Sequence, residues 1–359
     1  LIDSSSERVL YSKNENEKMY PASTTKILTA ILTLENCKLD DVVTVPYEAI
    51  ITIPSGYSVA ALQTGEQLTV EQLLKLMMVH SANDAANVLA FHVSGSISSF
   101  ANLMNQKVDD LGLTNTHFTN PSGMHDENHY TCARDMALIG REIWRYPEFL
   151  KICQEQSYTI PASDTTEEHV FAQHHKMLID VNKNYYEYAV AGKTGYTSNA
   201  LSTLITMADN GNMKLVCVVL RTHGANIYPD TRNLFEYAFH NFQKISVADE
   251  KKPSEVREFI QASERQETEN ADQSVSSGDN EYQALEDGYV LLPGGVTFDD
   301  VKYKIEDVDE STGEGTVRYT YDGHQVGSAT ARLSEAYLQK LSNKKNVDSK
   351  QDNVDNFGK

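Results

Sequence analysis

The chain of 359 residues has no long hydrophobic run. A membrane-spanning helix needs roughly 18 or more consecutive apolar residues, and the run at residues 215–220 has only the length of a buried strand. A secretory leader is also missing, since Leu1 leads directly into polar sequence. We therefore expect either a cytoplasmic protein or the mature, trimmed part of a longer one.

Positive charge is scarce as well. The sequence has 31 lysines and arginines against 51 aspartates and glutamates, a formal net charge of −20. Such a surface repels phosphates, so we expect no nucleic-acid partner. The hydrophobic share of 40% and the charged share of 23% are those of a globular protein, and the length allows one large domain or two ordinary ones.

Cysteines are few and scattered, at positions 37, 132, 153 and 217, with no C-x-x-C pair and no histidine at zinc-ligand spacing. Three disulfide pairings or four free thiols stay open, and we interpret the four as buried, passive thiols. His125 and His129 are assigned to a solvated loop, and His174 and His175 to the surface. No metal and no cofactor are expected.

Residues 1–246 have the pattern of one mixed unit of helices and strands. Val9–Tyr11 is typical of a short strand, and apolar residues then recur every three or four positions, as on the buried face of a helix. The expected helices are residues 23–34, 69–78, 97–108, 136–143 and 234–242. Met77 and Met78 are interpreted as core residues of the second of these.

Local signals mark several ends of these elements. Thr69 and Gln72 form a capping box, Gly112 is placed to end a helix, and Pro147 is placed to stop one. The strands expected at 201–207 and 213–220 flank an Asn-Gly turn, which is typical of a hairpin. We predict an α+β fold with an antiparallel sheet covered by helices.

The composition changes after residue 246. Acidic residues, serine and glutamine dominate residues 247–287, which we interpret as an acidic linker. Residues 288–342 carry short strand-like runs separated by turns and are predicted to form a small all-β domain. These runs are residues 289–292, 302–305, 316–321 and 325–331. The polar tail, 343–359, is expected to be disordered.

Three short motifs occur in order along the first unit. They are Ser23-Thr24-Thr25-Lys26, Ser81-Ala82-Asn83 and Lys193-Thr194-Gly195. Each alone is common, but S-x-x-K, S-x-N and K-T-G together are the signature of enzymes that acylate a serine.

The residue types suit that chemistry. Lys26 shares a helix face with Ser23 and can take the hydroxyl proton once its pKa is lowered, with Lys193 as the second cation that lowers it. Ser81 can relay a proton to the leaving amine, and the Asn83 amide can hold Lys26.

The remaining groups of the third motif suit substrate binding. The backbone N–H groups of Ser23 and Tyr196 can bind the oxyanion. Lys193 and Thr194 would face a substrate carboxylate, while Gly195 permits close approach of an extended peptide to an edge strand.

At these residues the sequence resembles the low-molecular-mass penicillin-binding proteins, the serine-type D-alanyl-D-alanine carboxypeptidases. The resemblance covers about residues 1–245 and extends beyond the three motifs. Further matching segments are residues 100–105, 111–113, 116–123, 129–137 and 193–197. It implies a β-lactamase-like catalytic domain, limited to residues 1–246, followed by the β-rich domain. It also implies peptidoglycan stem peptides as substrates, β-lactam antibiotics as covalent inhibitors, and an extracytoplasmic enzyme held at the cytoplasmic membrane by an anchor that this chain lacks.

Two departures bear on the substrate. His174, His175 and Met177 stand where the family often has an Asn-bearing segment. Ile227–Pro229 replace the arginine that the family assigns to the substrate's terminal carboxylate, with Arg221 and Arg232 as candidate substitutes. Two alternative functions stay open. One is a wall-binding or β-lactam-sensing protein that acylates without turnover; the other is a class A β-lactamase, although no Glu-x-x-x-Asn loop occurs between the second and third motifs.

Overall fold

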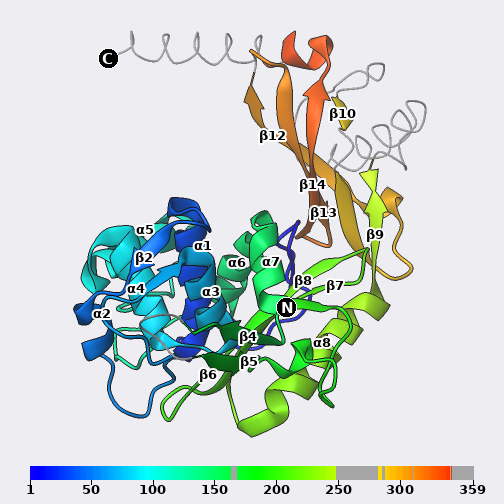
Figure 1. Cartoon of the computed structure of the whole chain (residues 1–359). Coiled ribbons are helices and arrows are strands. Elements are labelled where there is room, and N and C mark those ends of the chain that lie inside the picture. The colour runs from blue at the N-terminus through cyan, green and yellow to red at the C-terminus, as the bar shows by residue number, and fades with distance from the viewer. Residues whose placement is uncertain (163–167, 248–281, 285–287, 310, 340, 342–359) are drawn as a thin grey trace, which may run out of the picture. The chain divides into compact units, whose positions relative to one another are not determined.

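A computed structural model describes residues 1–162, 168–247, 282–284, 288–309, 311–339 and 341 (Figure 1). The chain divides into two compact units, Leu1–Ala238 and Phe239–Lys359. Each unit has its own cluster of buried apolar side chains, as separately folding domains require. The three sequence motifs all lie in the first unit.

One half of the first unit is helical, drawn from blue to cyan in Figure 1. It contains α1 (Lys26–Asn36), α2 (Tyr47–Ile51), α3 (Val70–Val79), α4 (Asn83–Ser94), α5 (Ile97–Asp110) and the ribbon of β2 (Val42–Thr44) and β3 (Gln67–Thr69). The predicted capping box is confirmed, because Thr69 accepts from the backbone N–H of Gln72 and the Gln72 side chain accepts in return. Met77 and Met78 are buried, so their assignment to the core is confirmed too.

The other half of the first unit is built on an antiparallel sheet. Its strands are β1 (Ile2–Asp3), β6 (Ala189–Thr197), β7 (Leu201–Asp209) and β8 (Lys214–Thr222), in the order β1-β8-β7-β6. Helices α6 (Ala133–Arg141) and α7 (Pro147–Gln154) pack on the sheet, and α8 (Ile227–Asn241) lies on its other side (Figure 1). A second ribbon joins β4 (Ser157–Ile160) to β5 (His169–Ala172). The predicted hairpin and the antiparallel sheet covered by helices are therefore confirmed.

The second unit is an antiparallel β-sheet. It contains β9 (Phe242–Ser246), β10 (Tyr282–Ala284), β11 (Tyr289–Pro293), β12 (Lys302–Asp309), β13 (Glu314–Tyr321) and β14 (His324–Leu333). The strand order is β12-β13-β14-β11-β9, and β10 also pairs with β14. Each strand-like run predicted in this region is a strand.

Several local predictions for the first unit are wrong at the level of single elements. The strand lies at Ile2–Asp3 rather than at Val9–Tyr11, and Val9 contributes only an isolated bridge to Ile2. The segment from Ser23 begins as a 3-10 turn, η1 (Ala22–Thr25), before α1 starts at Lys26. Pro147 was expected only to stop a helix, but it is the first residue of α7. Its fixed backbone angle suits the first turn of a helix.

Two further corrections concern the chain after α8. Phe242 was assigned to the last helix but is the first residue of β9. Residues 282–284 were placed in the acidic linker but form β10, whose pairing with β14 supplies the backbone hydrogen bonds that composition alone did not reveal. The other residues expected as linker, mainly 248–281, and the tail from 343 lie outside the described residues, so the domain limits at 246, 287 and 342 stay predictions.

Candidate active site

Ser23 lies in the η1 turn directly before α1. Its side chain is partly exposed, whereas those of Ala22, Thr24 and Thr25 are buried. Ala22 has a φ of 49°, in the left-handed region that is strained for residues other than glycine. The buried neighbours thus fix a strained turn that leaves the Ser23 hydroxyl accessible.

Lys26 is fully buried one turn after Ser23. Its Nζ donates to Ser23 Oγ at 3.0 Å, to Asn83 Oδ1 at 2.6 Å and to the backbone oxygen of Ser122 at 2.7 Å. Burial, and next the charge of Lys193, lower the pKa of Lys26 well below that of a free lysine, although Asp84 acts in the opposite direction. A neutral amine is therefore far easier to form here than on the surface, and it would face the Ser23 hydroxyl as a general base.

The second motif joins α3 to α4. Ser81 is nearly buried and has a φ of 66°, so a second left-handed residue stands at the site. Asn83 begins α4 and directs its amide oxygen at Lys26. The next residue, Asp84, accepts the backbone N–H groups of Ala60 at 2.9 Å and Leu62 at 3.1 Å, which ties the loop between α2 and β3 to α4.

The third motif lies on β6, the strand at the edge of the described sheet. Lys193 is buried, its Nζ donates to the backbone oxygen of Thr194 at 3.0 Å, and burial lowers its pKa to about 7. Gly195 runs so close to the nucleophile that a Cβ there would stand 2.8 Å from the Ser23 backbone nitrogen. The structure thus brings the third motif to the Ser23 turn, as the sequence predicts.

Tyr196 follows on β6 with its side chain exposed. It pairs with Ser202 of β7. Its predicted role as the second donor to the oxyanion stays a prediction.

A contact that the sequence reasoning missed comes from the loop before α6. The side-chain oxygen of Asn120 accepts the backbone N–H groups of Ser122, Gly123 and Met124 at 3.2, 2.8 and 3.1 Å. These three hydrogen bonds fix the turn in which the Ser122 carbonyl oxygen faces Lys26. The Asn-Pro-Ser-Gly sequence was the available signal, because an Asn before such a turn commonly caps the following N–H groups.

Comparison with known proteins agrees with this geometry. Residues 1–224 match the model of the peptidase S11 family, described as D-alanyl-D-alanine carboxypeptidase. The chain belongs to that family. It is 35% identical over 257 residues to D-alanyl-D-alanine carboxypeptidase DacF of Bacillus subtilis, an alignment that covers 68% of this chain and 62% of that protein.

Two further likenesses cover most of the chain. D-alanyl-D-alanine carboxypeptidase DacA of Haemophilus influenzae is 32% identical over 354 residues, which cover 93% of this chain and 83% of that protein. The crystal structure of penicillin binding protein 5 from Haemophilus influenzae matches with a TM-score of 0.68 at 26% identity, over 92% of this chain and 94% of the other. The predicted penicillin-binding-protein fold is thereby confirmed for this member of the carboxypeptidase family.

The sequence-based predictions for two histidines, that one lies in a solvated loop and the other on the surface, are wrong. His129 is buried instead of solvated: its Nδ1 accepts the Thr119 N–H at 3.0 Å, and its Nε2 lies 2.8 Å from Thr25 Oγ1. Because Nδ1 accepts, the neutral ring carries its proton on Nε2, which donates to Thr25 beside the nucleophile. Burial lowers the pKa of His129 to about 3, so this neutral form is the working one.

His175 is also buried rather than on the surface, with Nε2 2.9 Å from Thr206 Oγ1 and a pKa that burial lowers to about 3. A Cβ on Gly192 of β6 would stand 2.5 Å from that Nε2, so the ring supports β6 directly beside Lys193. His174, in contrast, is exposed as predicted, and its ring lies 5.1 Å from that of His80.

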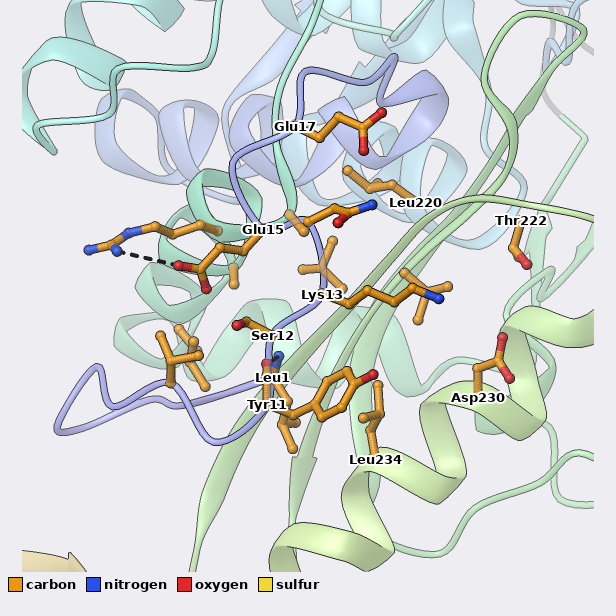
Figure 2. A pocket seen from close by; sticks show the side chains of 18 of the residues that line it. Leu1, Tyr11, Ser12, Lys13, Glu15, Glu17, Leu220, Thr222, Asp230 and Leu234 are labelled. Carbon is orange, nitrogen blue, oxygen red and sulfur yellow. Dashed lines mark hydrogen bonds and ion pairs between the residues drawn. The ribbon is translucent and has the colours of Figure 1, made fainter. Parts of the chain in front are cut away.

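Within the described part of the chain, neither candidate arginine makes a hydrogen bond or an ion pair with a residue of the three motifs. The guanidinium of Arg232 donates to the backbone oxygens of Tyr185 and Asn184 and lies over the Tyr186 ring. Arg221 lines a cavity of about 840 Å³ between the N-terminal segment, β8 and α8. Figure 2 shows Tyr11, Lys13 and Leu234 around this space, and no residue of the three motifs lines it. Among the sequence-predicted groups, Lys193 and Thr194 are therefore the remaining candidates for a substrate carboxylate.

Proposed function

We propose that this chain hydrolyses the terminal D-alanyl-D-alanine bond of peptidoglycan stem peptides through an acyl-enzyme on Ser23. The observation that carries the proposal is the buried Lys26 amine, which lies 3.0 Å from Ser23 Oγ and is held by Asn83 and Ser122. Family membership supports the same reaction.

The steps follow from the site. Neutral Lys26 takes the Ser23 proton as Oγ attacks the penultimate D-alanine carbonyl, and the N–H groups of Ser23 and Tyr196 stabilise the oxyanion. Lys26 gives up that proton through the Ser81 hydroxyl, which relays it to the leaving amine, so that free D-alanine departs, Lys26 is neutral again and an ester remains on Ser23. Water then hydrolyses the ester and returns the proton to Ser23. The charged form of Lys193 and the Thr194 hydroxyl hold the carboxylate of the terminal D-alanine.

We infer that β-lactams acylate Ser23 as mimics of this substrate, and that the enzyme works outside the cytoplasm, at a membrane-held position on the bacterial cell surface. Within the described residues, no helix is long and apolar enough to cross a membrane. The anchor is therefore a proposal that rests on the family resemblance alone.

The deciding experiment measures release of D-alanine from a diacylated Lys-D-Ala-D-Ala peptide before and after treatment with penicillin. Release that penicillin abolishes is expected. Covalent penicillin binding without any release would instead favour a sensor that acylates but does not turn over. Rapid hydrolysis of penicillin itself would favour a β-lactamase.

A further inference from the structure

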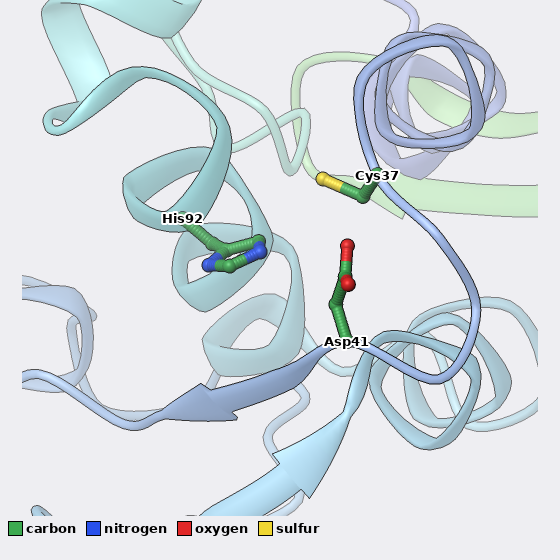
Figure 3. A group of neighbouring side chains, drawn as sticks. All are labelled: Cys37, Asp41 and His92. Carbon is green, nitrogen blue, oxygen red and sulfur yellow. The ribbon is translucent and has the colours of Figure 1, made fainter.

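Three side chains that can bind a metal converge away from the catalytic motifs. Cys37, Asp41 and His92 each offer a ligand atom, and these atoms all lie within 4.8 Å of one another. Figure 3 shows the three side chains directed at a common space. They come from three different places in the chain: the end of α1, the loop before β2 and the last turn of α4.

The backbone around the three side chains is well fixed. The Cys37 N–H donates to the Thr33 oxygen at 2.9 Å and ends α1. Asp41 is held on both sides, because its N–H donates to the Lys38 oxygen and its own oxygen accepts from Val70. One carboxylate oxygen of Asp41 also accepts the Lys38 N–H at 2.8 Å, which orients the carboxylate as an outer-shell hydrogen bond does in known metal sites.

The electrostatics of the helices favour a cation at this point. Helix α1 ends at Asn36, directly before Cys37, and α4 ends at Ser94, two residues after His92. The carboxyl end of a helix carries roughly half a negative charge, so two such ends and the Asp41 carboxylate act on the same space. This second observation is independent of the ligand atoms themselves.

The donor set selects the kind of ion. Thiolate, imidazole and carboxylate together suit Zn²⁺ and similar divalent transition metals, whereas Ca²⁺ and Mg²⁺ prefer oxygen alone. Around a tetrahedral zinc ion with bonds of about 2.0–2.3 Å the donors stand roughly 3.5 Å apart. Since the three atoms lie within 4.8 Å of one another, they need to approach by roughly 1.3 Å at most, and the His92 side chain is exposed.

We propose that Cys37, Asp41 and His92 form a binding site for a zinc-class divalent metal ion that fastens the end of α1 to the end of α4. Cys37 binds as the thiolate, and its proton passes to solvent when the metal enters. The fourth coordination position is open to water. Because Lys26 begins α1 and Asn83 begins α4, the ion joins the far ends of the two helices that carry the base and its amide partner.

The test is a titration of the metal-free, reduced full chain with Co²⁺, a spectroscopic substitute for zinc. We expect one equivalent to bind with a thiolate-to-cobalt charge-transfer band that Zn²⁺ then removes. Cys37→Ser should abolish the band, while the other three thiols are still present as an internal control. Asp41→Asn and His92→Gln should each weaken Co²⁺ binding about tenfold or more, and His223→Gln, at an exposed histidine, should leave it unchanged.

Thermal unfolding supplies a second measurement. Zn²⁺ should raise the melting temperature of the wild type but not that of Cys37→Ser, since a ligand stabilises only the state that binds it. Absence of the charge-transfer band, or wild-type affinity in His92→Gln, would overturn the proposal. Penicillin acylation of Ser23, measured on each variant, reports separately on the catalytic proposal, since none of the three residues belongs to the catalytic machinery.

Discussion

The side chain of Lys26 is buried with an acceptor for each of its three protons, and one of these acceptors is the hydroxyl of Ser23, the proposed nucleophile. Water would ordinarily stabilise the lysine charge, and its exclusion together with the charge of Lys193 lowers the pKa. The lowered pKa that suits Lys26 to its proposed role as base is thus a consequence of where α1, α4 and the Ser122 loop place it.

Removing the nucleophile or its base should separate binding from chemistry. Ser23→Ala should form no covalent penicillin adduct by intact-mass measurement while its circular dichroism stays unchanged. Lys26→Ala should still bind penicillin but acylate about 10²-fold more slowly or worse. Lys151→Ala, at an exposed lysine, is the control, and an adduct in Ser23→Ala would show that another residue is the nucleophile.

Replacing Lys193 should move the pH dependence of acylation. The Lys193 cation lowers the pKa of Lys26, so Lys193→Gln should raise that pKa. Lys26 must be neutral to act, hence the fall of the rate on the acid side should begin at a higher pH in the variant. The shift should be visible below about pH 7, where the wild-type Lys193 is charged. If the acylation rate of Lys193→Gln is lower at every pH but falls at the same pH as in the wild type, this coupling is contradicted.

The sequence was enough to predict that Ser23, Lys26, Asn83 and Lys193 form one site. Each of these side chains belongs to a recognisable motif, and the three motifs occur in the expected order. The Ser122 contact escaped that reasoning, because the Asn-Pro-Ser-Gly sequence indicates a turn but does not say which group the backbone oxygens of that turn will contact. Burial of His129 depends on packing against residues far away in the sequence, such as Thr25. The polar sequence of residues 125–129 gives no sign of that packing. Cys37 and His92 are likewise far apart in the chain and meet only where two helices end.

At the scale of elements, the Asn120 loop and the η1 turn are fitted to each other. A Cβ on Gly123, whose φ is 83°, would stand 1.8 Å from the Ala22 backbone oxygen and 2.9 Å from Thr25 Oγ1. The loop therefore approaches the turn as closely as backbone can, and only glycine permits it.

Gly123→Ala should destabilise the protein and slow acylation together, because the loop must retreat and carry the Ser122 oxygen away from Lys26. We expect a loss of about 3 kcal/mol or more in the free energy of unfolding, measured in urea. Gly65→Ala is a matched control, with a φ of 85° and nothing within 4 Å of its Cβ. It should cost about 1–2 kcal/mol from the backbone conformation alone and leave acylation unchanged.

Elements were predicted best where a signal is local. The capping box of α3 and the hairpin of β7 and β8 depend on neighbouring residues. The wrong assignments, Val9–Tyr11 and Phe242, concern short apolar segments whose state is decided by the strand available to pair with them. Ile2 is held by Val216 of β8, and Phe242 is paired with Pro293.

At the scale of the whole molecule, buried neutral histidines make stability depend on pH. The pKa values of His129 and His175 fall from 6.5 to about 3 on folding. Between these values the unfolded chain binds protons that the folded chain does not, so the free energy of unfolding decreases as pH falls. Well above pH 6.5 both states are neutral and neither residue contributes to the slope.

Each of these histidines should contribute about 1.4 kcal/mol per pH unit to that decrease. When the pH is lowered from 6.5 to 5, the free energy of unfolding should fall less in His129→Gln and in His175→Gln than in the wild type. Urea unfolding at pH 6.5 and at pH 5 measures this fall. His223→Gln should follow the wild type. Equal slopes for all four proteins would show that the two histidines are charged inside the fold.

Under the proposed function, the position of β6 at the edge of the described sheet would limit how often the enzyme acts on one peptide. Main-chain pairing accepts an extended peptide of any side chains, so the strand alone cannot decide which bond lies over Ser23. In the proposed mechanism Lys193 makes this choice, because its charge would pair with a carboxylate one residue beyond the bond. Removal of the terminal D-alanine would leave a new carboxylate on the former penultimate D-alanine. The residue before it is not D-alanine, so the shortened peptide would no longer end in the D-alanyl-D-alanine pair. Under the proposed reaction the cut would therefore be self-limiting, and each stem peptide would be shortened once.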